Sequence, residues 1–208
     1  MKNFNPEILT IDKTFEYKLK EQGSEFTAIA NPVNSEQETD EILGRVKTKY
    51  HDASHHCYAY RLDKNTYRYS DAGEPSGTAG IRILNAIDHF SLSRILIIVV
   101  RYFGGKKLGT GLLGKTYYKA AFNVLNQSSF VKRIAFRSVT LTVDFTYLNN
   151  FYHLIKETES RIVKSEFEEK AKFNCMIKPE LIEEFISKMK EISGGRIKTE
   201  VGREIIYL

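Results

Sequence analysis

The fold is decided by the stretch ILIIVVRYFGGKKLGTG, residues 95–111. Its apolar, β-branched beginning predicts a buried strand over residues 94–101, because such runs pack well in a sheet. Glycines and lysines dominate residues 102–111, and this mixture predicts a surface loop. Apolar residues at helical spacing follow over residues 113–124, so a helix continues from the loop.

The elements expected upstream complete a mixed α/β domain. A second glycine-rich loop, residues 71–80, opens a further helix, for which Ser76 is a natural N-cap. Ser35 and Glu38 form a capping box that predicts a helix over residues 36–50. Alternating apolar residues predict strands at 14–20, 25–33, 54–62 and 67–70. Together these elements predict a two-layer mixed α/β domain over residues 1–135.

The pattern restarts after a boundary expected between residues 132 and 138. Alternation predicts a strand over 139–145, and helical spacing follows it. The elements expected next are a helix at 147–157, hairpin strands at 161–167 and 170–177, a helix that starts near Pro179 and a last strand at 196–201. The order βαββαβ is the ferredoxin-like pattern, so residues 136–208 are expected to form an α+β second domain of that type.

Composition limits the class of protein. None of the 208 residues lies in an apolar run of 18 or more, so no membrane span is expected. The N-terminus has no apolar signal-peptide core. Cys57 and Cys175 are the only cysteines and lie in different predicted domains, so no disulfide is expected. These features together predict a cytoplasmic protein without a membrane partner.

The positive charge is concentrated in the middle of the chain. Residues 53–137 carry a net charge of +9, whereas residues 1–52 carry −3 and residues 138–208 carry −1. A basic segment of this kind is typical of a protein that binds a polyanion. The alternative is a solvated basic surface without a partner.

Both glycine-rich loops run into the start of a helix, where free amide groups and the helix dipole attract anions. Glycines allow close approach of the backbone to a phosphate, and the basic residues add full charges. The alternative is that the glycines serve only turns and close packing. The predicted phosphate or nucleic-acid site comprises Arg101, Gly104, Gly105, Lys106, Lys107, Gly109, Thr110 and Gly111, together with Ser76, Gly77 and Thr78.

One motif in this region is misleading. Residues 109–116, GTGLLGKT, match the P-loop string of nucleotide-hydrolysing enzymes. A true P-loop follows its strand directly, whereas residues 104–108 intervene here. Leu113 belongs to the helical stripe, which places Gly114 and Lys115 inside a helix that has already begun. The match is therefore interpreted as accidental.

Other polar residues receive weaker functional interpretations. His55 and Cys57 share one face of a predicted strand and His56 points to the other, so no metal site is expected. Asp71 and Glu74 suit acid–base chemistry, but ordering the turn and capping the helix is the favoured role. His55, His56, Asp71 and Glu74 are therefore possible functional residues. No catalytic residue and no cofactor is predicted.

Three blocks resemble the YigZ/IMPACT family in order and spacing: SHHCYAY at 54–60, SDAGEPSGTAG at 70–80 and VRYFGGKKLGTG at 100–111. The resemblance is strong over residues 15–130, and residues 138–208 are similar to the C-terminal domain of bacterial members. Ala72 stands where a second aspartate is common in the family, which argues against a mechanism based on paired aspartates.

The resemblance implies two modules known from translation. The first domain should resemble the second domain of a small-subunit ribosomal protein, and the second should resemble the last domain of elongation factor G. It implies no established catalytic residues. Eukaryotic relatives regulate translation by competing for a protein partner of a stress kinase.

Three functions are consistent with the sequence. The leading hypothesis is a translation-associated regulatory protein, not an enzyme, that binds structured RNA or a ribosomal surface. The first alternative is an enzyme or binder that acts on a nucleotide or another phosphorylated small molecule. The second alternative is a regulator that binds a protein partner.

Overall fold

The structure is a computed structural model that describes residues 5–208, and these form two compact units. The N-terminal unit comprises residues 9–132, and the C-terminal unit comprises residues 5–8 and 133–208. The division therefore falls within residues 132–138, where the boundary was expected, and residues 5–8 group with the C-terminal unit.

The N-terminal unit is built around a five-stranded antiparallel sheet with the strand order β2-β3-β6-β4-β5. The elements are β2 (Phe15–Glu21), β3 (Ser24–Pro32), α1 (Glu36–Lys49), β4 (His55–Arg61), β5 (Tyr67–Ser70), α2 (Gly80–His89), β6 (Ile95–Tyr102) and α3 (Thr110–Asn126).

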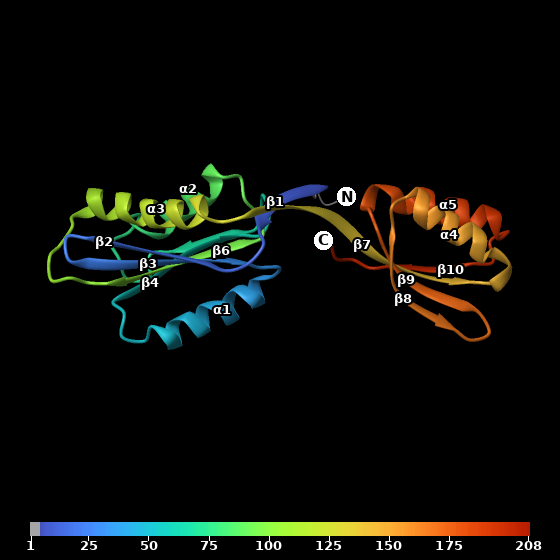
Figure 1. The fold of residues 1–208 in the computed structure, drawn as a ribbon, viewed down its shortest axis with the longest axis horizontal. Helices are drawn as coiled ribbons and strands as arrows, with labels where there is room; N and C mark the ends of the chain where they lie inside the picture. The colour runs from blue at the N-terminus through green and yellow to red at the C-terminus, as the bar shows by residue number, and fades with distance from the viewer. Residues whose placement is uncertain (1–4) are drawn as a thin grey trace. The chain divides into compact units, whose positions relative to one another are not determined.

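Helices cover both faces of this sheet, with α2 and α3 on one face and α1 on the other (Figure 1). The expectation of a two-layer domain is therefore wrong, because the unit has three layers. The physical reason lies in β6, in which Ile97 and Val99 face the α2–α3 core whereas Ile98 and Val100 face α1. A strand buried on both faces is apolar at every position instead of alternating.

The C-terminal unit has the predicted βαββαβ order. Its strands are arranged β10-β7-β9-β8, and every neighbouring pair is antiparallel. Helices α4 and α5 pack on one face around Phe151, Phe173 and Phe185. The elements are β7 (Phe130–Val143), α4 (Leu148–Glu157), β8 (Arg161–Phe167), β9 (Ala171–Ile177), α5 (Ile182–Ile192) and β10 (Lys198–Val201).

Two short strands were not predicted, β1 (Glu7–Ile11) and β11 (Ile206–Tyr207). Both pair with β7, which is longer than expected and includes the division between the units. The two residues of β11 are too few to show an alternation, and the sequence of β1, EILTI, does not alternate strictly. No helix within residues 5–208 has both the length and the apolar character needed to cross a membrane.

A candidate phosphate-binding site at two glycine-rich loops

The two glycine-rich loops meet at a cavity in the N-terminal unit. The first loop, residues 71–79, joins β5 to α2, and the second loop, residues 103–109, joins β6 to α3. The cavity has a volume of about 450 Å³. Its lining comprises His55, Gly73, Glu74, Pro75, Arg101, Phe103, Lys107, Leu108, Gly109, Thr110 and Leu113. The fold thus brings together residues from both predicted phosphate loops.

Asp71 organises the first loop. Its carboxylate accepts hydrogen bonds from the amides of Gly77 at 2.9 Å, Ala79 at 2.9 Å and Gly80 at 2.8 Å. Burial alone raises the pKa of Asp71, but these amide bonds outweigh it and hold the pKa below its ordinary value. Helix α2 begins at Gly80, so the expectation that Ser76 caps it is wrong. The capping function belongs to Asp71.

The first loop therefore offers few free donors to a phosphate. The amide of Gly77 is bound to Asp71, and the hydroxyl of Thr78 donates to the carbonyl of Pro75 at 2.6 Å. Thr78 is buried, whereas Ser76 is exposed and does not line the cavity. Of the predicted phosphate residues in this loop, the structure brings none to the cavity.

A buried ion pair lies beneath the cavity. Nη1 of Arg101 is 2.6 Å from Oε1 of Glu74, and the hydroxyl of Tyr117 donates to the same oxygen at 2.7 Å. Arg101 is only 4% exposed, and its Nη2 also donates to Ser24 at 3.2 Å. Because its charge is neutralised by Glu74, Arg101 does not act as the solvent-exposed phosphate contact that was expected. It instead anchors the first loop to β6.

Cys57 extends this network into the core. Its Sγ donates to the carbonyl oxygen of Asp71 at 2.9 Å and lies 3.3 Å from the hydroxyl of Tyr117. Burial raises the pKa of Cys57 to about 12, and burial also raises the pKa of Tyr117. Both groups therefore remain protonated at neutral pH, and neither suits nucleophilic chemistry.

The two histidines point to opposite faces of β4, as the alternation of a strand requires. Nδ1 of His55 lies 3.0 Å from the carbonyl oxygen of Ala72, and its Nε2 lies 3.8 Å from Oε2 of Glu74. His56 instead contacts the carbonyl oxygen of Tyr50 at 3.0 Å. Within residues 5–208, no group of His, Cys, Asp and Glu has the arrangement of a metal site.

The second loop is held by a close backbone contact. A Cβ atom on Gly104 would lie 2.0 Å from the backbone of Gly23, so only glycine fits here. The amide of Gly104 also donates to Ser24 at 3.2 Å. Gly105 and Gly109 have φ values of +84° and +74°, which favour glycine. The glycines thus fold the loop so that its lysines are presented at the surface.

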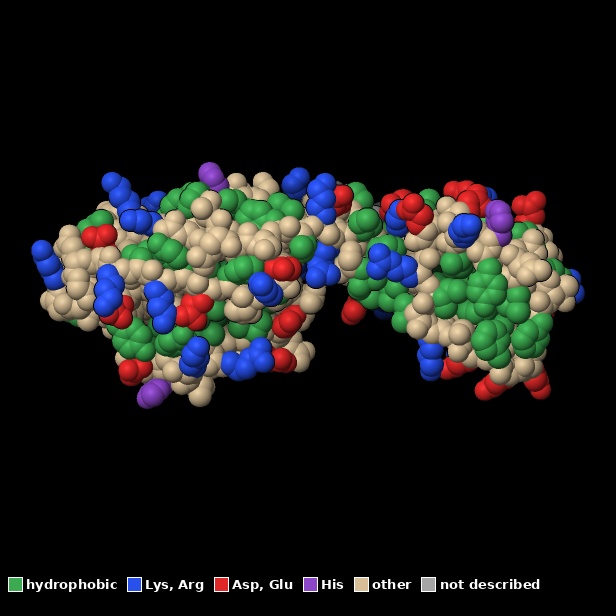
Figure 2. All heavy atoms as spheres, in the orientation of Figure 1, with side chains coloured by type: hydrophobic (Ala, Val, Ile, Leu, Met, Phe, Trp, Pro, Cys, Tyr) green, Lys and Arg blue, Asp and Glu red, His purple; other side chains and the backbone are tan. Residues whose placement is uncertain are grey.

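The exposed cations of the second loop are Lys106 and Lys107, and Lys107 lines the cavity. Beside them, Thr110 and Gly111 form the exposed first turn of α3, where amides lack partners within the helix. Figure 2 shows further Lys and Arg side chains at the end of the unit where this loop and the start of α3 lie. This end of the unit is suited to an anion.

The resemblance to a P-loop is accidental in the structure as well. Helix α3 begins at Thr110, so Gly114, Lys115 and Thr116 lie inside it. Gly114 is buried close to Arg82, and the hydroxyl of Thr116 donates to the carbonyl of Leu112 at 2.8 Å. These residues form no cradle for phosphates.

Sequence reasoning did not assign a role to the apolar lining of the cavity. Pro75, Phe103, Leu108 and Leu113 come from three separate segments, so their proximity depends on the tertiary fold. The sequence offered a local signal only for Phe103, a large aromatic residue in a glycine- and lysine-rich loop, and its side chain is 48% exposed in the structure.

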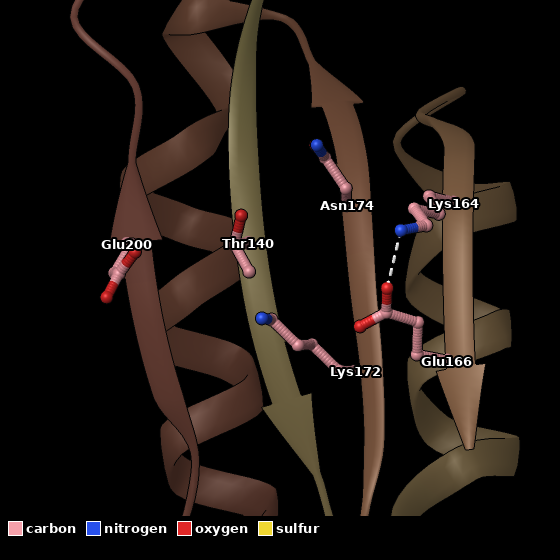
Figure 3. A pocket seen from close by; sticks show the side chains of 6 residues that line it. All are labelled: Thr140, Lys164, Glu166, Lys172, Asn174 and Glu200. Atoms are coloured by element: carbon pink, nitrogen blue, oxygen red, sulfur yellow. Dashed lines mark ion pairs between the residues drawn. The ribbon is translucent and has the colours of Figure 1, made fainter. Parts of the chain in front are cut away.

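The C-terminal unit has a separate shallow hollow on the open face of its sheet (Figure 3). Its volume is about 250 Å³, and its lining comprises Thr140, Lys164, Glu166, Lys172, Asn174 and Glu200. Lys164 and Glu166 form an ion pair at 2.6 Å. The charges are mixed and exposed to solvent, so this surface favours no particular ligand.

Comparisons with known proteins identify the family. The Impact N-terminal domain matches residues 22–125. A Thermus thermophilus protein, described as an IMPACT family member in the pol 5′ region, is 33% identical over 158 residues, which cover 76% of this chain and 86% of that protein.

The chain belongs to the IMPACT family.

Another IMPACT family member, YvyE of Bacillus subtilis, is 29% identical over 201 residues, which cover 96% of this chain and 92% of that protein. The mouse protein named IMPACT is 26% identical over 117 residues, only 36% of its length. A crystal structure of a hypothetical protein shares the fold with a TM-score of 0.72 and 24% identity, covering 97% of this chain and 99% of that one. The predicted resemblance to the YigZ/IMPACT family is confirmed.

Proposed function

We propose that this IMPACT family member is a translation-associated protein that binds structured RNA, free or at a ribosomal surface. The observation that carries the proposal is the end of the N-terminal unit where Lys106 and Lys107 flank the exposed first turn of α3. Lysines and helix amides together are the usual contacts of a protein to a nucleic-acid backbone. The net charge of +9 on residues 53–137 supports a polyanionic partner.

The contacts expected differ in kind. Lys106 and Lys107 supply mobile full charges, whereas the amides of Gly105, Thr110 and Gly111 supply directed donors. Arg101 has no place among these contacts because it is buried against Glu74. Such a site recognises the phosphate backbone and its shape instead of a base sequence. It requires no catalytic step.

The proposal is tested by reversing the two loop lysines. We expect Lys106→Glu with Lys107→Glu to weaken RNA binding and to reduce the slope of log Kd against log salt by about 1.4–1.8, since each phosphate contact contributes roughly 0.7–0.9. Fluorescence anisotropy with a labelled structured RNA, measured across a salt series, gives both quantities. The matched control is Lys47→Glu with Lys64→Glu, which changes the charge equally at exposed sites outside the cavity.

If both pairs of substitutions weaken RNA binding equally, the effect is due to net charge, and the second loop is not part of the binding site. If the unmodified chain binds no RNA even at low salt, the proposal fails. A protein partner captured after nuclease treatment would then favour the regulator that acts through protein contacts.

A further inference from the structure

The cavity beside the phosphate-binding end contains more than a backbone phosphate requires. A phosphate needs amides and cations, yet Pro75, Phe103, Leu108 and Leu113 also line the cavity. Its volume of about 450 Å³ lies in the range of small-molecule sites, which extends over about 300–1,000 Å³. Sites of that class combine an apolar lining with a few polar groups that orient the ligand.

Phe103 has the environment of a stacking platform. Its side chain is 48% exposed, and the guanidinium carbon of Arg101 lies 5.6 Å from its ring centroid. Arg101 is in turn 5.3 Å from the ring centroid of Phe26, so its position is fixed from the core side. An exposed aromatic ring supported in this way suits a planar ligand ring, such as a nucleobase.

The polar groups of the lining have unused hydrogen-bonding capacity. Oε2 of Glu74 and Nε2 of His55 are 3.8 Å apart, which is too long for a hydrogen bond. Both residues line the cavity, so a polar ligand group that lies between these two atoms could bond to them.

His55 and Glu74 together suit a ligand group that donates hydrogen bonds. The carbonyl of Ala72 can only accept, so Nδ1 of His55 carries the proton and Nε2 of the neutral ring is an acceptor. Nε2 and the neighbouring carboxylate oxygen therefore form a pair of acceptors in the cavity lining. An amino group of a ligand, which has two N–H donors, would satisfy both.

We infer that the cavity holds a single unstacked nucleotide. Its ring lies on Phe103, its phosphate contacts Lys107 and the first turn of α3, and an amino group lies between His55 and Glu74. For a nucleotide within RNA the inference rests on the proposed function. A free mononucleotide has the same chemistry, and the experiment separates the two sources.

The experiment compares two labelled RNA hairpins of equal length by fluorescence anisotropy with the full chain. One hairpin carries a single unpaired adenosine, and the other is fully paired. We expect the unpaired nucleotide to tighten binding roughly five- to 100-fold, the range that stacking of one base provides. Phe103→Ala should abolish this difference, whereas Phe103→Tyr should retain it. The matched control is Tyr69→Ala, because Tyr69 is 44% exposed and lies outside the cavity.

The free nucleotide is tested with adenosine monophosphate by thermal unfolding. If the nucleotide stabilises the unmodified chain but not Phe103→Ala, and no RNA binds, the nucleotide site is supported and the RNA proposal fails. If both hairpins bind equally and only the lysine reversal weakens them, the nucleotide site is overturned and the RNA proposal stands. The absence of any response to RNA and to the nucleotide overturns both.

Discussion

At the scale of single residues, Glu74 connects the first loop to two elements of the core. Its carboxylate contacts Arg101 of β6 and Tyr117 of α3, and its side chain is only 3% exposed. A buried ion pair contributes little net stability relative to apolar residues, but the loss of one partner leaves the other charge buried and unpaired. The position of the first loop therefore depends on this carboxylate.

We expect Glu74→Gln to lower the free energy of unfolding by about 3–5 kcal/mol, because it leaves Arg101 as an uncompensated buried charge. Urea denaturation measures the change. The control is Glu25→Gln, which disrupts the solvent-exposed ion pair with Lys20 and should lower the free energy of unfolding far less. Similar costs for both variants would contradict the importance of burial.

Asp71 should make stability depend on pH. Its pKa is lowered in the folded chain, so its contribution is present above the unfolded pKa of about 3.9 and is lost as pH falls through the folded pKa. We expect Asp71→Asn to cost about 1–2 kcal/mol at neutral pH, and this cost should shrink as the pH falls below 4. Urea denaturation at several pH values measures it, with exposed Asp40→Asn as the control. A cost that is constant with pH would argue against the charge of Asp71.

At the scale of the elements, the second loop is shaped by its contact with the turn between β2 and β3. Gly104 has no room for a side chain, whereas a Cβ on Gly111 would meet nothing within 4 Å. We expect Gly104→Ala to destabilise the chain by about 1–3 kcal/mol because the turn must move. Gly111→Ala should be neutral or stabilise it by up to about 1 kcal/mol. Thermal unfolding compares the two, and equal effects would mean that the contact is not tight.

The elements themselves were largely predictable because their signals are local. The capping bond from Ser35 to Glu38, the apolar run of β6 and the alternation in β9 each appear within a few residues. Long-range features were not predictable. That α1 covers the second face of the sheet, and that Gly104 contacts Gly23, depends on which segments the fold brings together. Asp71 has the turn-ordering and capping role that was favoured for it, but Ser76 was wrongly named as the N-cap because the amides that Asp71 binds lie six to nine residues further along the chain.

At the scale of the whole molecule, the two units have separate buried cores. Phe173 is fully buried in the C-terminal unit and stacks on Phe151 with ring centroids 4.1 Å apart. We expect Phe173→Ala to cost about 3–5 kcal/mol and to reduce hydrogen-exchange protection in residues 133–208. Protection in β6 and RNA binding through the second loop should remain. Equal loss of protection in both units would show that they unfold as one cooperative block.

The burial of both cysteines has a practical consequence for labelling. Burial raises the pKa of Cys57 and of Cys175 to about 12, so both thiols are almost entirely protonated at neutral pH. A maleimide dye reacts with the thiolate and therefore leaves both native residues essentially untouched. A single cysteine introduced at exposed Ser76 would be the one reactive position. Fluorophore attachment beside the cavity thus requires no cysteine-free background.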